Sequence, residues 1–329
     1  MGKAVIYYLI LIILAVLSVG FFVNKNMKYD DAYDSESINE IQVSSSMPMY
    51  EPGGYQSVYA VIPDGEDVNA DQFKDDTYAV LLVDNEERVP IVSYNSLRRI
   101  YPASTTKLMT ALVVCDALYS GQFGLEDEIT ITHDPNITEE GALKSEIKPG
   151  CTITVRNLLY GLLMKSYNDY AVILAELVAG DQASFCDLMN QKALEIGATG
   201  SHFANPHGLH DDNHYITAYD MYLILQEAEK YDIIKEIDSY DSFSYTYTDA
   251  EGAICEDDIT PTNMFLAGNI ALPSNITINS WKTGTTELAG NILAMNVTID
   301  DKEYSMFVAD AVSPDDLYDK YGLLFNLTK

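Results

Sequence analysis

Positive charge is scarce in this chain of 329 residues, which has 19 Lys and Arg against 50 Asp and Glu. The formal charge of −31 argues against nucleic acid as a partner, because such binding takes much of its affinity from basic side chains on phosphates. It fits a soluble, self-repelling surface. The four cysteines include no C-x-x-C pair, so neither a redox dithiol nor a zinc ribbon is expected, and the sequence chooses no disulfide pairing.

Charged residues are also missing from residues 4–23. Twenty helical residues span about 30 Å, the thickness of a hydrocarbon core. One interpretation of residues 1–23 is a signal peptide cleaved after Ser18-Val19-Gly20. The other is an uncleaved anchor with its amino end in the cytoplasm, and the apolar residues 21–23 beyond the cleavage site favour it. Both interpretations place the rest of the chain outside the cytoplasm.

The remaining sequence divides at about residue 75. Residues 24–75 are acidic and turn-rich with little periodicity, which predicts a flexible tether. Within 76–329, strand patterns at 77–84 and 89–95 precede several helical patterns, a polar hairpin at 240–262, further strands and a last helix. This order predicts an α+β domain. Its antiparallel sheet is built from N- and C-terminal strands and flanked by helices, and an all-helical lobe is inserted between them.

The most informative motif is Ser104-Thr105-Thr106-Lys107, which follows Pro102 at the start of a helical pattern. A serine and a lysine three residues apart lie on one helix face. The lysine can take the serine's proton if burial or nearby positive charge favours its neutral form. The start of a helix also favours developing negative charge.

Two further motifs follow in the chain, Ser166-Tyr167-Asn168 and Lys282-Thr283-Gly284. The ordered set S-x-x-K, S-x-N and K-T-G is typical of penicillin-binding proteins and class A β-lactamases. With its flanking segments, including FANPHGL and WKTGTTELAG, the chain resembles serine-type D-alanyl-D-alanine carboxypeptidases, low-molecular-weight penicillin-binding proteins, over residues 77–327. The resemblance implies the β-lactamase/DD-peptidase-like fold.

In that family Ser104 would be the nucleophile and Lys107 its base. Ser166 would pass a proton to the leaving amine, and Asn168 would hold the substrate amide and Lys107. Lys282 would recognise a free carboxylate and lower the pKa of Lys107.

The K-T-G segment would complete substrate binding. Thr283 and Thr285 would hydrogen-bond the carboxylate, and Gly284 belongs to the same substrate-binding strand. The backbone N–H groups of Ser104 and Thr285 would form the oxyanion hole. The implied partners are peptidoglycan pentapeptide stems, with β-lactams as covalent inhibitors and the membrane through the N-terminal segment. No cofactor and no metal are implied.

The chain departs from the family pattern in several places. Tyr167 stands where a small residue is usual and is expected to narrow the cleft. No arginine follows Arg156, so Lys282 and the threonines must bind the carboxylate without one. The sequence ends after the catalytic domain, so we expect an N-terminal anchor to replace the C-terminal membrane helix of many relatives.

Three alternatives stay open. A class A-like β-lactamase would share the motifs, but no glutamate occurs between Ile196 and Glu227 to activate a deacylating water. A catalytically silent wall-binding or sporulation module could use the same scaffold. His207, His210 and His214, with Asp211 and Asp212, have the residue types and spacing of a zinc site. The sequence also does not separate carboxypeptidase from endopeptidase activity.

Overall fold

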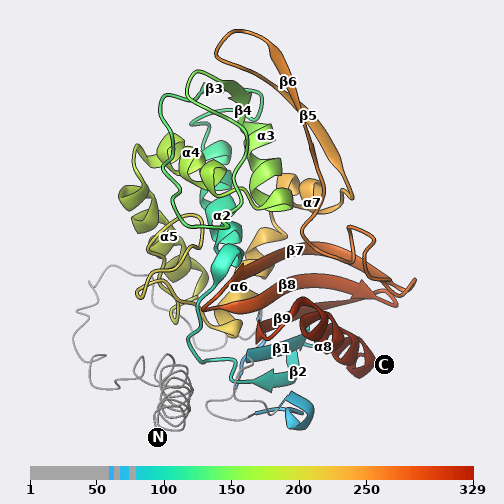
Figure 1. Cartoon of the computed structure of the whole chain (residues 1–329). Coiled ribbons are helices and arrows are strands. Elements are labelled where there is room, and N and C mark those ends of the chain that lie inside the picture. The colour runs from blue at the N-terminus through green and yellow to red at the C-terminus, as the bar shows by residue number, and fades with distance from the viewer. Residues whose placement is uncertain (1–58, 63–66, 74–78) are drawn as a thin grey trace, which may run out of the picture. The chain divides into compact units, whose positions relative to one another are not determined.

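The computed structural model describes residues 59–62, 67–73 and 79–329 (Figure 1). The predicted membrane segment, residues 1–23, lies outside these ranges, as does most of the predicted tether. Within the described ranges, no helix has the length and apolar character to cross a bilayer.

A five-stranded antiparallel sheet, in the order β2-β1-β9-β8-β7, forms the base of the fold. As predicted, strands from both ends of the domain build it, and β7 is an edge strand (Figure 1). Its strands are β1 (Ala79–Asp84), β2 (Val89–Tyr94), β7 (Ile276–Thr286), β8 (Gly290–Ile299) and β9 (Lys302–Ala311).

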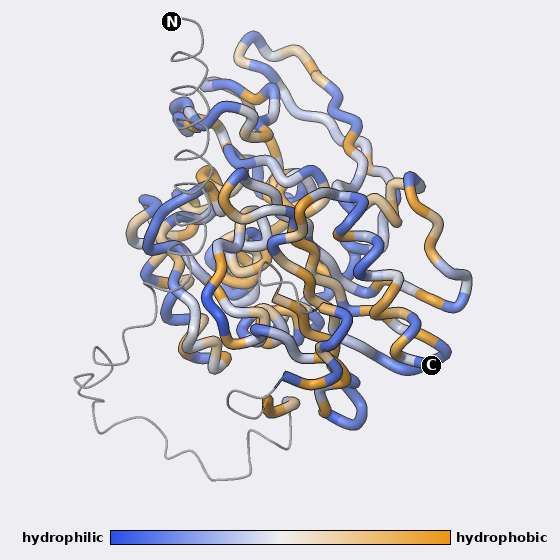
Figure 2. Tube along the Cα trace, turned by 60° about the horizontal axis from the view of Figure 1, so that its bottom comes forward, coloured by the Kyte–Doolittle hydropathy of each residue, from blue (hydrophilic) through white to orange (hydrophobic). Residues whose placement is uncertain are grey.

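Helices cover both faces of this sheet. Because side chains alternate between faces along a strand, Val80, Leu82 and Met306 join the core under α8 (Pro314–Leu327). The opposite face packs against α6 (Ala218–Ala228). Hydrophobic stretches concentrate toward the middle of the fold, and the outer loops are largely hydrophilic (Figure 2).

The middle of the chain forms the predicted helical lobe around α2, whose residues are almost all buried. Several helices begin at a side-chain cap, for example Asp181, which accepts a hydrogen bond from the Ser184 N–H at 2.8 Å. The helices of the lobe are α2 (Thr106–Tyr119), α3 (Val155–Tyr160), α4 (Asn168–Ala179), α5 (Gln182–Ile196) and α7 (Asp232–Asp238). Short helical turns are η1 (Asp71–Phe73), η2 (Ala103–Thr105) and the π-helical η3 (Gly161–Lys165).

The lobe is not all-helical, which corrects one element of the prediction. A second, four-stranded sheet in the order β3-β4-β5-β6 lies beside the helices. Its strands are β3 (Glu128–Thr130), β4 (Thr152–Thr154), β5 (Phe243–Thr248) and β6 (Ile254–Ile259). The β5–β6 pair is the predicted hairpin, whereas β3 and β4 are three residues each, too short to show a period.

Folded structure reaches into the region predicted as a tether. Ala60 and Phe73 are fully buried. Val68 and Ser93 exchange backbone hydrogen bonds at 2.9 and 3.0 Å. The described residues before 75 therefore pack on the catalytic fold. All four cysteines lie in the described part, and each carries a free thiol.

Candidate active site

Ser104 lies in η2, the turn that leads directly into α2. Thr106 Oγ1 donates a hydrogen bond to the Ala103 carbonyl at 2.8 Å. Ala103 itself has a left-handed backbone, with φ of +48°, a conformation that such residues adopt at a cost. This turn places Ser104 just before the N-terminus of α2, one helical turn before Lys107.

Lys107 is fully buried, and its Nζ lies 2.9 Å from Ser104 Oγ. It also donates to Asn168 Oδ1 and to the His207 carbonyl, both at 2.7 Å. Burial, and then repulsion from Lys282, hold the pKa of Lys107 well below its usual value. A neutral amine has two N–H groups, which the two carbonyl oxygens take. Its lone pair is left for the Ser104 hydroxyl, as a general base requires.

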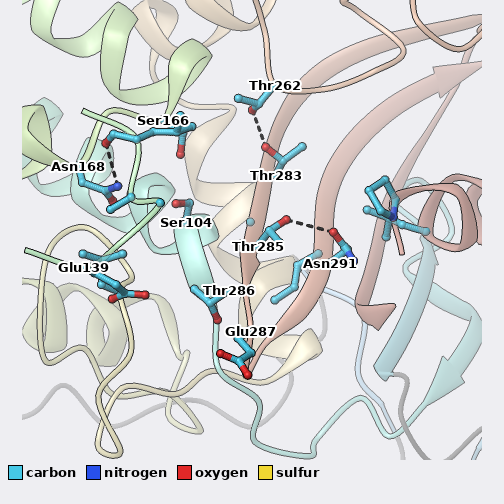
Figure 3. A pocket seen from close by; sticks show the side chains of 18 of the residues that line it. Ser104, Glu139, Ser166, Asn168, Thr262, Thr283, Thr285, Thr286, Glu287 and Asn291 are labelled. Carbon is cyan, nitrogen blue, oxygen red and sulfur yellow. Dashed lines mark hydrogen bonds between the residues drawn. The ribbon is translucent and has the colours of Figure 1, made fainter. Parts of the chain in front are cut away.

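The S-x-N motif bends sharply between η3 and α4. Ser166 has φ of +65°, and its buried Oγ has no hydrogen-bond partner among the described residues. A buried hydroxyl without a partner is unusual, and this one lines the cleft beside Ser104 (Figure 3). It is therefore available to a bound molecule. Asn168 is fixed by its Nδ2, which donates to the Leu143 carbonyl at 2.9 Å.

Tyr167 does not narrow the cleft as expected from the sequence. Its hydroxyl donates to Asp257 Oδ2 on β6 at 3.1 Å, and its ring packs edge-on against Tyr170. The side chain therefore points toward the β5–β6 hairpin, and Tyr167 is not among the residues that line the cleft.

The K-T-G motif lies on β7, opposite Ser104 (Figure 3). Gly284 approaches the nucleophile turn so closely that a Cβ there would lie 3.0 Å from the Ser104 nitrogen. Lys282 is fully buried, and burial lowers its pKa to about 7, against the raising effect of Asp238. Thr283 Oγ1 is hydrogen-bonded to Thr262 Oγ1, and Thr285 Oγ1 donates to Asn291 Oδ1 at 3.2 Å.

These elements enclose a cleft of about 590 Å³. Six of the eight residues predicted for the site line it, namely Ser104, Ser166, Asn168, Thr283, Gly284 and Thr285. The other two, Lys107 and Lys282, lie buried next to these residues. All three motifs, far apart in the sequence, are thus brought together.

The structure adds residues that the sequence motifs did not indicate. The carbonyl oxygens of His207 and Leu143 orient Lys107 and Asn168, and a backbone group leaves no signature in the sequence. Glu139 and Glu140 line the cleft from a segment that matches no motif considered, and Glu287 lines it from the segment just after the K-T-G motif, where no role was predicted for it.

The predicted histidine loop braces the nucleophile turn. His214 Nδ1 accepts hydrogen bonds from the N–H groups of Ala204 and Asn205, at 3.1 and 3.3 Å. Its Nε2–H is left to donate to Thr106 Oγ1, at 2.7 Å. His207 Nδ1 accepts from the Leu209 N–H at 3.1 Å. No group of three or more His, Cys, Asp or Glu side chains with metal-binding geometry occurs in the described ranges.

Comparisons with known proteins assign the family. A family model described as D-alanyl-D-alanine carboxypeptidase matches residues 66–313, and the chain belongs to this family of serine DD-peptidases. The D-alanyl-D-alanine carboxypeptidase DacC of Escherichia coli is 32% identical over 227 residues, 68% of this chain and 54% of the relative. The D-alanyl-D-alanine carboxypeptidase DacF of Bacillus subtilis is 33% identical over 171 residues, 52% of this chain and 42% of the relative. The chain thus spans about half the length of these curated relatives.

Solved structures show the same fold. The DD-transpeptidase of a Streptomyces strain superposes with a TM-score of 0.68, covering 76% of this chain and 95% of that one, at 24% identity. The predicted resemblance and fold class are therefore confirmed.

Proposed function

We propose that this protein is a serine D-alanyl-D-alanine carboxypeptidase that removes the terminal D-Ala from peptidoglycan stem peptides outside the cytoplasm. The observation that carries the proposal is the buried Lys107 amine, 2.9 Å from Ser104 Oγ, with its other contacts made to carbonyl oxygens. Family membership and the buried cation Lys282 beside the cleft support it.

In the proposed reaction Ser104 Oγ attacks the carbonyl carbon of the penultimate D-Ala as Lys107 takes its proton. The Ser104 and Thr285 N–H groups bind the oxyanion. The C–N bond then breaks, the leaving amine of the terminal D-Ala is protonated through Ser166, and an ester on Ser104 remains. Water hydrolyses the ester to a shortened peptide. Lys282 and Thr283 hold the carboxylate of the terminal D-Ala, and a penicillin presents the same group.

Fluorescent penicillin tests the assignment of the nucleophile. Wild type should form a stable adduct on the Ser104 peptide, and Ser104→Ala should lose it while remaining folded. Ser120→Ala, at an exposed serine after α2, is the control and should label normally. Labelling of another serine would refute the assignment. Absence of labelling in wild type would favour the silent module, and rapid release of hydrolysed penicillin would favour the β-lactamase.

Release of D-Ala tests the activity itself. We expect wild type to cleave a peptide ending in D-Ala-D-Ala and to discriminate strongly against its C-terminal amide. Lys282→Ala should lower the acylation efficiency by roughly two to three orders of magnitude, because the substrate carboxylate loses its buried cation, and should lose the preference for the acid. An unchanged preference would assign the carboxylate to another group.

We also propose that residues 1–23 remain attached and hold the enzyme at the outer face of the membrane. The support is the uncharged run at 4–23. Amino-terminal sequencing of the membrane fraction should find the intact start, whereas a mature protein starting at Phe21 would show a cleaved signal.

A further inference from the structure

Asp238 is a buried carboxylate that the proposed reaction does not use. It is the last residue of α7, which packs on β7. The side chain is fully buried, and Oδ1 has no hydrogen-bond partner among the described residues. Oδ2 accepts a hydrogen bond from the Trp281 N–H at 3.3 Å. A buried carboxylate with an unpaired oxygen is costly, so a purely structural contact is a poor reason for it.

The residue after Trp281 is Lys282, so Asp238 is held against the backbone that carries this lysine. β7 changes register against β8 between Ile278 and Ser280, so the strand is bent just before this contact. Lys282 Nζ donates to the Thr283 carbonyl at 3.1 Å. Among the described residues, no carboxylate forms an ion pair with Lys282 within 4 Å. Asp238 therefore acts on Lys282 at longer range, as one buried charge on another.

Four ionisable groups face one another around β7. Lys107 on α2 and Lys282 lie toward the cleft, and each disfavours a charge on the other. Asp238 contacts the backbone N–H of Trp281, the residue before Lys282, and the negative charge of Glu229, just after α6, raises the pKa of Asp238 further. Glu229 Oε1 already accepts from Ser280 Oγ at 2.8 Å and from Asn296 Nδ2 at 2.9 Å. Asp238 is therefore the carboxylate left to offset the charge on Lys282.

We propose that Asp238 is a positioning residue for Lys282, whose counter-charge keeps the lysine a cation that can bind the terminal carboxylate of the substrate. This rests on the proposed function of the site. Through Lys282 the same carboxylate also keeps Lys107 neutral, because one proton on Lys282 opposes a second on Lys107. Burial raises the pKa of Asp238 well above its usual value and lowers that of Lys282, while the charge on each residue favours the charge on the other. The two groups are therefore charged together or neutral together, and only the charged pair can bind the substrate carboxylate.

The test compares Asp238→Asn with wild type across pH. Asparagine keeps the size and the acceptor for the Trp281 N–H but removes the charge. In wild type kcat/KM should fall as pH rises through the pKa of Lys282, which lies near 7 in the free enzyme. In Asp238→Asn this alkaline limb of the kcat/KM profile should move to lower pH by about one unit or more. At pH values above the limb, kcat/KM should then be roughly tenfold lower than in wild type. The preference for the acid over its C-terminal amide should fall in parallel.

Asp241→Asn is the matched control, because Asp241 is exposed and its substitution changes the net charge by the same amount. It should leave the profile unchanged. A uniform loss of kcat/KM in Asp238→Asn with an unmoved limb would reduce Asp238 to a structural contact and overturn the proposal. An unchanged enzyme would do so too, because it would mean that Asp238 is neutral in wild type.

Lys282→Arg gives a test that does not depend on the folding of the Asp238 variant. Arginine stays charged at every pH used, so whatever activity it retains should lack the alkaline limb. Persistence of the limb would assign it to another group and overturn the proposal. If wild type releases no D-Ala and binds no penicillin at any pH, the proposed function fails instead, which is a separate result.

Discussion

At the scale of single residues, Gly208 has little room for a side chain. A Cβ at this position would lie 1.9 Å from the Ala103 carbonyl oxygen, in the turn before Ser104. Gly180 has nearly the same backbone, with φ of +86° against +88°, but nothing lies within 4 Å of its added Cβ. Alanine at either site meets the same backbone strain, about 1–2 kcal/mol, and Gly208→Ala adds overpacking.

We therefore expect Gly208→Ala to lower the free energy of unfolding by about 1–3 kcal/mol more than Gly180→Ala does. It should also slow penicillin acylation, because the displaced turn carries Ser104. Urea unfolding and labelling rates measure both effects. Equal stability of the two variants would show that the nucleophile turn can move away without cost.

His214 makes stability depend on pH. Burial lowers its pKa from 6.5 to about 3 in the folded protein. Between these values the unfolded chain binds a proton that the folded chain does not, so this contribution to stability is present above pH 6.5 and is lost as pH falls toward 3. Between pH 6.5 and pH 5 the loss should be roughly 1–2 kcal/mol.

Urea unfolding at the two pH values measures this contribution. His214→Asn should show a smaller decrease than wild type, whatever its absolute stability. His133→Asn, at an exposed histidine, should decrease as wild type does. Parallel decreases in His214→Asn and wild type would place the acid sensitivity elsewhere.

The side chains that do chemistry were predictable from the sequence, and the groups that position them were not. Ser104, Ser166 and Lys282 belong to three short motifs whose occurrence together, in this order, is typical of one class of enzyme. Asp238 carries no such pattern, because its role depends on α7 ending against β7, a contact between segments more than forty residues apart. The backbone oxygen of His207 is available on any residue, so only the folded loop reveals it.

At the scale of elements, tyrosines couple the S-x-N turn to the β5–β6 hairpin. Asp257 Oδ2 on β6 accepts from Tyr167 at 3.1 Å and from Tyr245 at 2.8 Å. Tyr245 also shares a hydrogen bond with Tyr170 on α4, at 2.7 Å. The hairpin therefore holds the turn that carries Ser166 and Asn168, although neither of its strands contributes to the cleft lining.

Tyr167→Phe should cost about 1 kcal/mol of stability and should slow acylation by loosening the turn. Asp257→Asn should act on the same network, so the double variant should cost less than the sum of the two single ones. Additive effects on the acylation rate would show that the hairpin and the turn act independently. Glu256→Gln, the neighbouring position on β6, serves as the control.

The long helices and strands could be predicted from the spacing of their apolar residues, and the short ones could not. The sheet strands and α2, α4, α5, α6 and α8 carry several turns or alternations of apolar residues. The short helix α7 and the three-residue strands β3 and β4 are stabilised by neighbours distant in sequence, so local pattern does not reveal them. The prediction of an all-helical lobe was wrong for this reason.

At the scale of the whole molecule, the charge of −31 should repel the anions that the site is proposed to bind. Added salt screens this repulsion. We expect the second-order rate of acylation by an anionic penicillin to rise roughly two- to tenfold from low to physiological salt. A zwitterionic β-lactam should respond less. A rate that falls with salt would mean that local positive charge governs the approach to the cleft.

The unpaired edge of β7 also limits how a peptide can lie in the site. β7 has a neighbouring strand on one side only, and on its other side the Trp281 N–H is already bonded to Asp238 Oδ2 at 3.3 Å. Residues 283–287 line the cleft instead. Because backbone groups alternate between the two edges of a strand, those of Thr285 lie on the same free side as that of Trp281. A peptide added along this edge finds a backbone partner at Thr285, whereas past Lys282 it meets the end of α7. The edge is therefore blocked beside Lys282, an arrangement that suits the tip of a chain better than a chain that continues. We therefore expect an exopeptidase, with cross-linked peptides cut far more slowly than free ends.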